Sequence, residues 1–277
     1  MIDILMSTYN GARYLAEQID SILGSSFADF RLMIRDDGSV DDTPALIAKY
    51  ASADGRITVV SDTLGNLGAS ASFMQLLELS SAPYFMFADQ DDVWLPDKIE
   101  RAYKRITQDE SPGLPNIVFT DLSVVDEKLK PIADSFWSYQ RLDPQIAHDW
   151  RGLLAQNVVT GCTVIGNAAA REAALPFALP EMMHDHWVAV NAARRGSISY
   201  ISEATVLYRQ HGENAEGGHR FSAKYAAGRT GSPLRRWQRY QRAARHFGGV
   251  SATGLALRKT RLNLRRLFGR SAPAPNA

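Results

Sequence analysis

Carboxylates at alternating positions form the most distinctive cluster of the sequence, Asp89-Gln90-Asp91-Asp92. The cluster directly follows an apolar segment, residues 84–88, that is typical of a buried strand. Carboxylates spaced in this way can supply the oxygen ligands that a hard divalent cation prefers, and such a cation can bind a diphosphate. Acidic turns without an ion are common, so the spacing alone leaves a solvated turn or a helix cap as the alternative.

A second acidic turn, Asp36-Asp37-Gly38-Ser39, follows another predicted strand, residues 30–35. A carboxylate here can accept a hydrogen bond from a ribose hydroxyl or a base N–H, or it can cap the helix that follows. Tyr9-Asn10-Gly11, after the first predicted strand, leaves the same alternatives open. The sequence has no Gly-x-Gly-x-x-Gly after the first strand and no Gly-x4-Gly-Lys-Ser/Thr motif, which argues against dinucleotide oxidoreductases and P-loop enzymes.

The elements that position these turns alternate between strand and helix patterns in the first hundred residues. Strands are predicted at residues 2–7, 30–35, 57–61 and 84–88, with a helix after each of the first three, the third at residues 70–79. This alternation predicts a mostly parallel sheet whose polar loops meet in one crevice at the carboxyl ends of the strands. The second half is less regular: strands are expected at 117–121, 123–126 and 161–166, a strand pair at 198–208, and a helix at 183–195.

The length of 277 residues and the 45% hydrophobic content predict a globular chain of one or two domains. The charges are distributed unevenly. Residues 217–277 contain 14 basic and no acidic residues, which leaves 17 basic against 30 acidic residues, net −13, in residues 1–216. A single cysteine, Cys162, excludes an intramolecular disulfide and a cysteine-based zinc site, and it fits a reducing compartment.

The sequence shows neither a secretory signal at its start nor an apolar run near the roughly 18 residues that span a bilayer, so it predicts a cytoplasmic protein. Residues 217–270 are predicted to form a basic helical extension, and residues 271–277 a disordered tail. Within residues 255–268, leucines interleave with basic residues. This pattern is typical of an amphipathic segment on an anionic membrane surface, and equally of a helix packed on the acidic body.

Four motifs together resemble the family 2 glycosyltransferases with the GT-A fold, which are inverting enzymes that use nucleotide-diphosphate sugars. The resemblance covers about residues 1–215, and its motifs are Leu5-Met-Ser-Thr-Tyr-Asn-Gly11, Arg35-Asp-Asp-Gly-Ser-Val-Asp-Asp-Thr43, Asn66-Leu-Gly68 and Ala88-Asp-Gln-Asp-Asp-Val-Trp-Leu-Pro-Asp97. Within the family, the chain is most similar to bacterial rhamnosyltransferases of cell-surface polysaccharide synthesis, through part of the last motif, Asp89-Gln-Asp-Asp-Val-Trp94, and through three further segments, Thr160-Gly-Cys162, His184-Asp-His-Trp187 and Tyr208-Arg-Gln-His-Gly212.

The resemblance implies an α/β, Rossmann-like GT-A fold with a mixed central sheet and a C-terminal helical extension. It implies a catalytic domain over residues 1–216, with a nucleotide-binding half at about 1–97 and an acceptor half at about 98–216. It also implies a divalent cation, Mn²⁺ or Mg²⁺, held by Asp91 with Asp89 and His211; the imidazole suits Mn²⁺ better.

The resemblance further implies that Asp185 is the general base that takes the proton of the acceptor hydroxyl. The alternative for Asp185 is an acid that only interacts with the N-terminus of a helix. The residues implied to bind the nucleotide are Thr8, Tyr9, Asn10, Asp36, Asp37, Asn66, Asp89 and Gln90. Those implied to contact the donor or acceptor sugar are Thr160, Gly161, His184 and Trp187, with Trp187 as a wall for the acceptor. His186 departs from the pattern, where an aromatic residue or a second acid is expected, and this leaves the acceptor open.

The predicted reaction is therefore the transfer of a sugar onto a glycan or lipid-linked acceptor. The preferred hypothesis for the donor is dTDP-rhamnose, from which rhamnose is transferred. A UDP-hexose donor is the alternative within this class. Two alternatives belong to other classes. A nucleotidyltransferase would require a Gly-rich loop with Arg or Lys after the first strand, which the segment Ser7-Thr-Tyr-Asn-Gly11 is not. A non-catalytic sugar-nucleotide-binding module could keep Asp91 but would not need Asp185. No nucleic acid partner is expected, and the predicted location is cytoplasmic or peripheral on the inner face of the plasma membrane.

Overall fold

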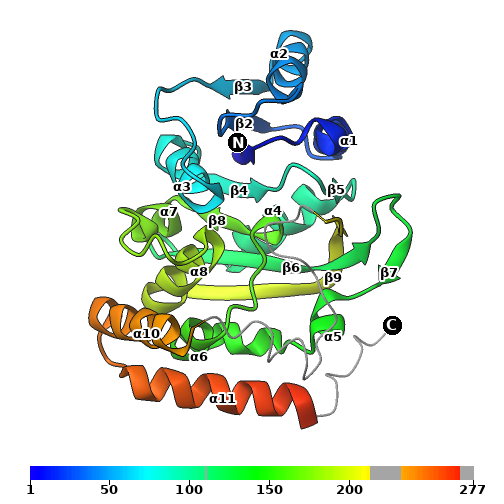
Figure 1. The fold of residues 1–277 in the computed structure, drawn as a ribbon. Helices are drawn as coiled ribbons and strands as arrows, with labels where there is room; N and C mark the ends of the chain where they lie inside the picture. Colours follow the sequence, from blue (N-terminus) through cyan, green and yellow to red (C-terminus); the bar gives the residue numbers. More distant parts are fainter. Residues whose placement is uncertain (110, 213–231, 269–277) are drawn as a thin grey trace.

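The structure is a computed structural model that describes residues 1–109, 111–212 and 232–268. Its centre is a mixed nine-stranded sheet in the order β3-β2-β1-β4-β8-β6-β9-β5, with β7 paired to β6 (Figure 1). The strands are β1 Ile2–Thr8, β2 Phe30–Asp36, β3 Ile57–Val60, β4 Tyr84–Ala88, β5 Val93–Trp94, β6 Asn116–Val125, β7 Pro131–Ala133, β8 Ile165–Asn167 and β9 Ser197–Arg209. The described helices are α1 Ala12–Leu23, α2 Thr43–Ala53, α3 Ala69–Leu79, α4 Lys98–Asp109, α5 Phe136–Gln140, α6 Trp150–Ala155, α7 Ala168–Ala174, α8 His184–Arg195, α10 Pro233–Phe247 and α11 Ala252–Phe268.

The first half of the chain forms the parallel part of the sheet, as the alternation of strands and helices predicts. β1 lies between β2 and β4, and β3 extends the sheet beyond β2, all in parallel. Ile4 and Met6 enter one hydrophobic core together with α1, α2 and α4, whereas Leu5 enters a second core with α3 and α8. β1, β2 and β4 are therefore buried on both faces, which explains their largely apolar sequences, whereas the edge strand β3 is partly exposed.

The second half makes the sheet mixed, as expected, but its strands differ from the predicted ones. The two strands expected at 117–126 are one strand, β6, and the pair expected at 198–208 is one strand, β9. β6 and β9 run parallel along their lengths, and their register shifts around Asp121 without ending the pairing. A bulge of this kind breaks the alternating pattern of a sequence but keeps the strand intact. The strand expected at 161–166 is a 3₁₀ turn, Gly161–Thr163, followed by β8.

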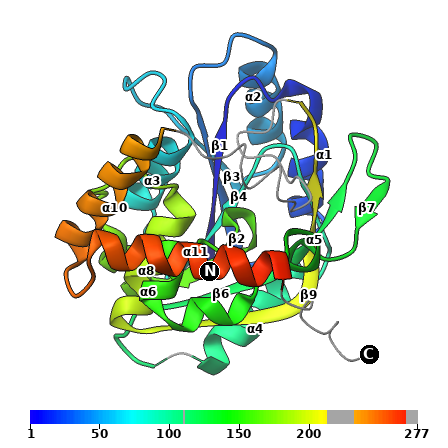
Figure 2. The same cartoon turned by 60° about the horizontal axis from the view of Figure 1, so that its bottom comes forward.

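The basic C-terminal segment packs on the rest of the protein in the form of two helices. Phe247 of α10 and Leu255 of α11 are buried in the core that also contains α6 and α8. Figure 2 shows α11 lying along the molecule next to α6 and α10, and Figure 1 shows it at the end opposite β3. Of the two arrangements considered for the extension, its described part therefore shows the one in which the helices pack on the rest of the protein. The predicted boundary at residue 217 and the predicted tail 271–277 lie outside the described residues. None of the described helices combines the length and the apolar character that a bilayer crossing needs.

Candidate active site

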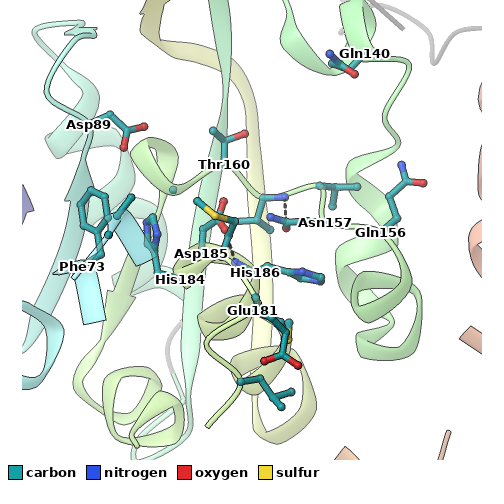
Figure 3. Close-up of a pocket in the computed structure, with 18 of the residues that line it drawn as sticks. Phe73, Asp89, Gln140, Gln156, Asn157, Thr160, Glu181, His184, Asp185 and His186 are labelled. Carbon is teal, nitrogen blue, oxygen red and sulfur yellow. Dashed lines mark hydrogen bonds between the residues drawn. The ribbon is translucent and has the colours of Figure 1, made fainter. Parts of the chain in front are cut away.

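One pocket of about 930 Å³ brings most of the predicted site residues together. It begins at the carboxyl ends of β1 and β4 and continues past the first turn of α8 to α6, α10 and α11. Figure 3 shows Asp89 on one side, Gln156 on the other, and Asp185 between them. The predicted residues that line the pocket are Thr8, Tyr9, Asp37, Asn66, Asp89, Gln90, Asp91, Thr160, Gly161, His184 and Asp185.

Two of the residues predicted to bind the nucleotide, Asn10 and Asp36, do not line the pocket and instead hold the turns beside it. The Asp36 carboxylate accepts hydrogen bonds from the Thr8 hydroxyl at 2.9 Å and from the Ser39 N–H at 2.9 Å. The Asn10 side-chain oxygen accepts a bond from the Val40 N–H at 2.9 Å. These contacts tie the loop after β1 to the loop after β2.

Asp37 lines the pocket, but its carboxylate is already engaged by the protein. It forms an ion pair with the buried Arg35 and accepts hydrogen bonds from the Leu67 and Gly68 N–H groups, both at 2.8 Å. Arg35 also pairs with Asp62, at 2.7 Å. The Asp37–Arg35 pair therefore fixes the loop that carries Asn66 to the pocket, a role of Arg35 that was not predicted.

Asp91 lines the end of the pocket near Asp89, and His211, 120 residues later in the sequence, contacts Asp91 without itself being a lining residue. The Nε2 atom of His211 is 2.8 Å from an Asp91 carboxylate oxygen. Burial, together with the charges of Asp91 and Asp185, raises the pKa of Asp89 to about 7. Such a concentration of negative charge is what a bound cation stabilises, and carboxylate oxygens with one imidazole nitrogen fit Mn²⁺ or Mg²⁺.

Arg209 holds the acidic motif in place from the end of β9. Its backbone N–H donates to the Asp92 carboxylate at 3.0 Å, and its Nε–H donates to the Asp91 carbonyl oxygen at 2.8 Å. Its guanidinium also forms an ion pair with Glu17 of α1. The Tyr-Arg-Gln-His segment therefore positions the motif through Arg209 and contacts it through His211.

Two carboxylates of the acidic motif form a cluster with Cys162, which was not predicted. Asp89, Asp92 and Cys162 offer ligand atoms within 4.8 Å of one another. Burial raises the pKa of the Cys162 thiol well above its usual value, so the thiol stays protonated and is a poor metal ligand. Burial also lowers the pKa of Lys98 to about 8; its ammonium lies 4.5 Å above the Trp94 ring. Apart from the position of Asp92 in the acidic motif, nothing in the sequence indicated that its carboxylate lies close to Cys162.

Asp185 lies in the first turn of α8, between the acidic motif and the far end of the pocket. One of its carboxylate oxygens accepts a hydrogen bond from the His186 N–H at 2.5 Å. Its charge contributes to the raised pKa of Asp89, so Asp185 lies within electrostatic range of the acidic motif. Asp185 is thus both a helix N-terminal acid and a pocket residue.

His184 is held as a neutral ring in the wall of the pocket. It stacks on Phe73 with the ring centroids 4.1 Å apart, and burial lowers its pKa to about 3. Neither ring nitrogen has a hydrogen-bond partner among the described residues. A Cβ at Gly161 would lie 2.8 Å from the His184 Nε2 atom, so a glycine is needed at this position.

The structure does not place Trp187 at the pocket, where the resemblance implied a wall for the acceptor. Its side chain is only 2% exposed, and its indole N–H donates to the Ala174 carbonyl oxygen at 2.6 Å. The side chain packs on Phe177 and Phe247, so it points from α8 into the core between α7 and α10. His186 lines the pocket instead, with its Nε2 atom 2.8 Å from the Leu153 carbonyl oxygen.

The far end of the pocket is built largely from the C-terminal extension, which was not predicted to contribute to the site. The lining residues of α10 and α11 are Arg236, Arg239, Tyr240, Ala243, Lys259, Asn263 and Arg266. Gln140 and Gln156 complete this end (Figure 3). The excess of basic residues in the extension was the available signal, but nothing in the sequence indicated that they face the pocket.

The sequence matches the family described as Glycosyl transferase family 2 over residues 3–162. It is 26% identical over 251 residues to the dTDP-rhamnosyl transferase RfbG of Shigella flexneri, covering 84% of this chain and 81% of that protein. An uncharacterized glycosyltransferase of Nostoc sp. is 26% identical over 221 residues, covering 77% of this chain and 66%, just under two thirds, of the relative.

Solved structures share the fold at low sequence identity. The structure of S. aureus TarS 1–349 in complex with UDP-GlcNAc superposes with a TM-score of 0.66 at 17% identity, covering 98% of this chain and 73% of TarS 1–349. The mannosyltransferase PcManGT of Pyrobaculum calidifontis, in complex with GDP-Man and Mn²⁺, has a TM-score of 0.63 at 16% identity, covering 96% and 70%.

Proposed function

The chain belongs to glycosyl transferase family 2 and has the GT-A fold, and from this premise we propose that it is an inverting, metal-dependent glycosyltransferase. The observation that carries the proposal is that a single pocket connects the loop after β1, the acidic motif and Asp185. A nucleotide sugar and an acceptor can therefore meet within one site. The nucleotidyltransferase alternative is disfavoured because Ser7, Thr8 and Tyr9, rather than a basic Gly-rich loop, line the pocket after β1.

In the proposed reaction, Asp185 accepts the proton of the acceptor hydroxyl while the hydroxyl oxygen attacks the anomeric carbon of the donor sugar. The bond between that carbon and the nucleoside diphosphate breaks in the same step, which gives inversion. Asp185 lies in the first turn of α8, where a carboxylate interacts favourably with the helix dipole. Thr160, Gly161 and the neutral His184 are proposed to contact the sugars; all three line the pocket.

Asp91, Asp89 and His211 are the residues proposed to hold Mn²⁺ or Mg²⁺. When bound, the cation would offset the negative charge that develops on the leaving diphosphate. This assignment is supported by the 2.8 Å contact between His211 and Asp91 and by the acidic surroundings of Asp89. The Mn²⁺ in the complex of PcManGT agrees with it.

For the donor we propose dTDP-rhamnose, on the basis of the similarity to the dTDP-rhamnosyl transferase RfbG over most of both chains. A UDP-hexose is the second candidate, since TarS binds UDP-GlcNAc with the same fold. The acceptor is proposed to be a glycan or a lipid-linked sugar of cell-surface polysaccharide synthesis.

We further propose that the protein works in the cytoplasm, peripherally on the inner face of the plasma membrane. The exposed leucines Leu257 and Leu264 of α11 lie among basic residues, and this composition suits an anionic surface. Co-sedimentation with anionic liposomes tests this point: a Leu257→Ser/Leu264→Ser variant should pellet less than the unchanged protein. Equal pelleting would contradict membrane attachment through α11.

A panel of nucleotide sugars with Mn²⁺ tests the proposed function. A matched donor at 100 times its dissociation constant should stabilise the fold by about 2.7 kcal/mol, and dTDP-rhamnose should give the largest shift in melting temperature. Turnover is then followed as release of the nucleoside diphosphate. If no nucleotide sugar stabilises the protein, the proposal is wrong; if a UDP-hexose gives the largest shift, only the rhamnose assignment fails.

A further inference from the structure

The side chain of Gln90 joins the loop after β1 to the acidic motif. Its Oε1 atom accepts a hydrogen bond from the Tyr9 N–H at 2.8 Å, and its Nε2 atom donates to the Tyr9 carbonyl oxygen at 3.0 Å. A primary amide offers the same donor and acceptor as a peptide group, so Gln90 pairs with Tyr9 much as a neighbouring strand would. We refer to these two hydrogen bonds as the Gln90 clamp.

The Gln90 clamp lies where the sheet no longer pairs the two segments. The register of β1 with β4 extends to Met6 and Ala88, although β1 itself continues to Thr8. Beyond this point the clamp connects the loop after β1, which was predicted to bind the nucleotide, to the acidic motif, which is proposed to hold the cation. The clamp therefore spans the two parts of the site that one nucleoside diphosphate has to contact.

Gly11 makes room for the Gln90 clamp. A Cβ atom at Gly11 would lie 2.2 Å from the Gln90 Oε1 atom and 2.4 Å from its Cδ atom. The φ angle of Gly11 is −105°, a negative value that other residues can adopt, so the glycine is needed for the close approach of the amide. An alanine at this position would displace the amide and break the clamp, while Gln90 itself stays unchanged.

The loop after β1 is also held by contacts that do not involve Gln90. The Asn10 N–H donates to the Ser39 hydroxyl oxygen at 2.8 Å, and the Gly11 N–H donates to the Thr43 hydroxyl oxygen at 2.9 Å. These hydrogen bonds fix the loop to the segment after β2. Loss of the Gln90 clamp should therefore leave the loop folded and release its position relative to the acidic motif.

The Gln90 clamp fixes the backbone of Tyr9 and leaves its ring accessible. Tyr9 lines the pocket and is 49% exposed. An exposed aromatic ring can stack on the flat face of a nucleobase. The clamp thus sets the distance between such a stacking contact and a diphosphate bound at the acidic motif.

We propose that Gln90 is a positioning residue that holds the loop after β1 in register with the acidic motif, so that a nucleoside diphosphate contacts both at once. This inference rests on the proposed function and deepens it. The nucleoside half of the ligand binds at the loop, and the diphosphate half binds at the acidic motif. Two joined halves bind more tightly than separate ones only when the spacing of their subsites matches the link between them. Gln90 fixes that spacing.

Binding of the joined ligand and of its two halves tests this role. The ligands are dTDP with Mn²⁺, thymidine alone, and inorganic pyrophosphate with Mn²⁺; UDP and uridine are used if UDP binds the unchanged protein more tightly than dTDP. Gln90→Ala and Gly11→Ala should each weaken binding of the nucleoside diphosphate at least about fivefold, because the two hydrogen bonds of the clamp are lost. Binding of each half should change less than about twofold. A direct contact of Gln90 with the nucleoside would weaken thymidine binding as well, and a damaged fold would weaken all three ligands.

The double variant Gly11→Ala/Gln90→Ala supplies an independent measurement. Because both single changes break the same clamp, the double variant should bind the nucleoside diphosphate no more weakly than Gln90→Ala does. The control is Gly55→Ala, where the added Cβ meets nothing within 4 Å, and it should bind all three ligands as the unchanged protein does. Additive losses in the double variant would show that Gly11 and Gln90 act separately, and they would overturn the proposal.

The same measurements distinguish a failure of this inference from a failure of the proposed function. If the unchanged protein binds dTDP or UDP and Gln90→Ala binds it equally well, Gln90 is not a positioning residue and the proposed function stands. The same conclusion follows if Gln90→Ala weakens thymidine binding as much as it weakens dTDP binding. If the unchanged protein binds neither nucleoside diphosphate, the proposed function and this inference are both wrong.

Discussion

Replacing Phe247 by alanine should destabilise the whole protein, because this side chain joins the C-terminal extension to the catalytic body. Phe247 is 1% exposed, and its ring centroid lies 5.6 Å from that of Trp187 and 6.3 Å from that of Trp150. Removing a buried phenylalanine typically costs about 3–5 kcal/mol. Since a domain is stable by only about 5–15 kcal/mol, the Phe247→Ala variant should lose a large fraction of its stability.

Urea denaturation followed by circular dichroism measures this loss. The midpoint should fall while the slope with urea stays the same, because the extension and the body unfold as one unit. Leu257→Ala is the matched control: this α11 side chain is 56% exposed, and its removal should change the free energy of unfolding by no more than about 0.5 kcal/mol. If Phe247→Ala costs no more than Leu257→Ala, the extension does not belong to the cooperative core and the reasoning is refuted.

Three further substitutions test the site. Asp185→Asn should keep donor affinity but lower the transfer rate by about 10²- to 10⁴-fold, and an unchanged rate would show that Asp185 is only a helix N-terminal acid. Asp91→Ala should abolish turnover and weaken the binding of the nucleoside diphosphate measured by calorimetry. Excess chelator should weaken this binding to the unchanged protein in the same way, and tight binding of the nucleoside diphosphate in chelator would exclude the metal role. Gly161→Ala should destabilise the fold by about 1–3 kcal/mol and slow turnover, because the new Cβ would lie 2.8 Å from the His184 Nε2 atom. Its control is Gly55→Ala, where the added Cβ meets nothing within 4 Å, and a similar loss of melting temperature in both would refute the crowding argument.

The parallel half of the fold and the location of the pocket could be predicted because the strands there are short and largely apolar, and each of the first three is followed by its own helix. Local patterns suffice for such units. The mixed half could not be predicted to the same extent, since the register shift near Asp121 interrupts the alternation inside one continuous strand. The 3₁₀ turn at Gly161–Thr163 likewise occupies a segment whose residues suit a strand.

Within the site, the motif residues are near one another as predicted, but sequence order could not separate pocket residues from their supports. Asp36 and Asp37 are adjacent, yet only Asp37 lines the pocket. Trp187 lies two residues after Asp185 and turns into the core, because α8 is packed on α7 and α10 and that side faces inward. Arg239 and Lys259 line the pocket because α10 and α11 fold back onto α6, and no local sequence pattern predicts contacts between segments so far apart in the chain.

The antiparallel insertion of β8 between β4 and β6 has a consequence for how the chain is made. β4 ends at Ala88, but its neighbour β8 ends only at Asn167, 79 residues later. At about 5–20 residues per second, a ribosome needs about 4–16 s to supply that partner. During this interval one edge of a hydrophobic strand is open, and open edges favour association between chains. A chain cut after residue 97 would keep this edge permanently, so the nucleotide-binding half should aggregate when it is produced alone.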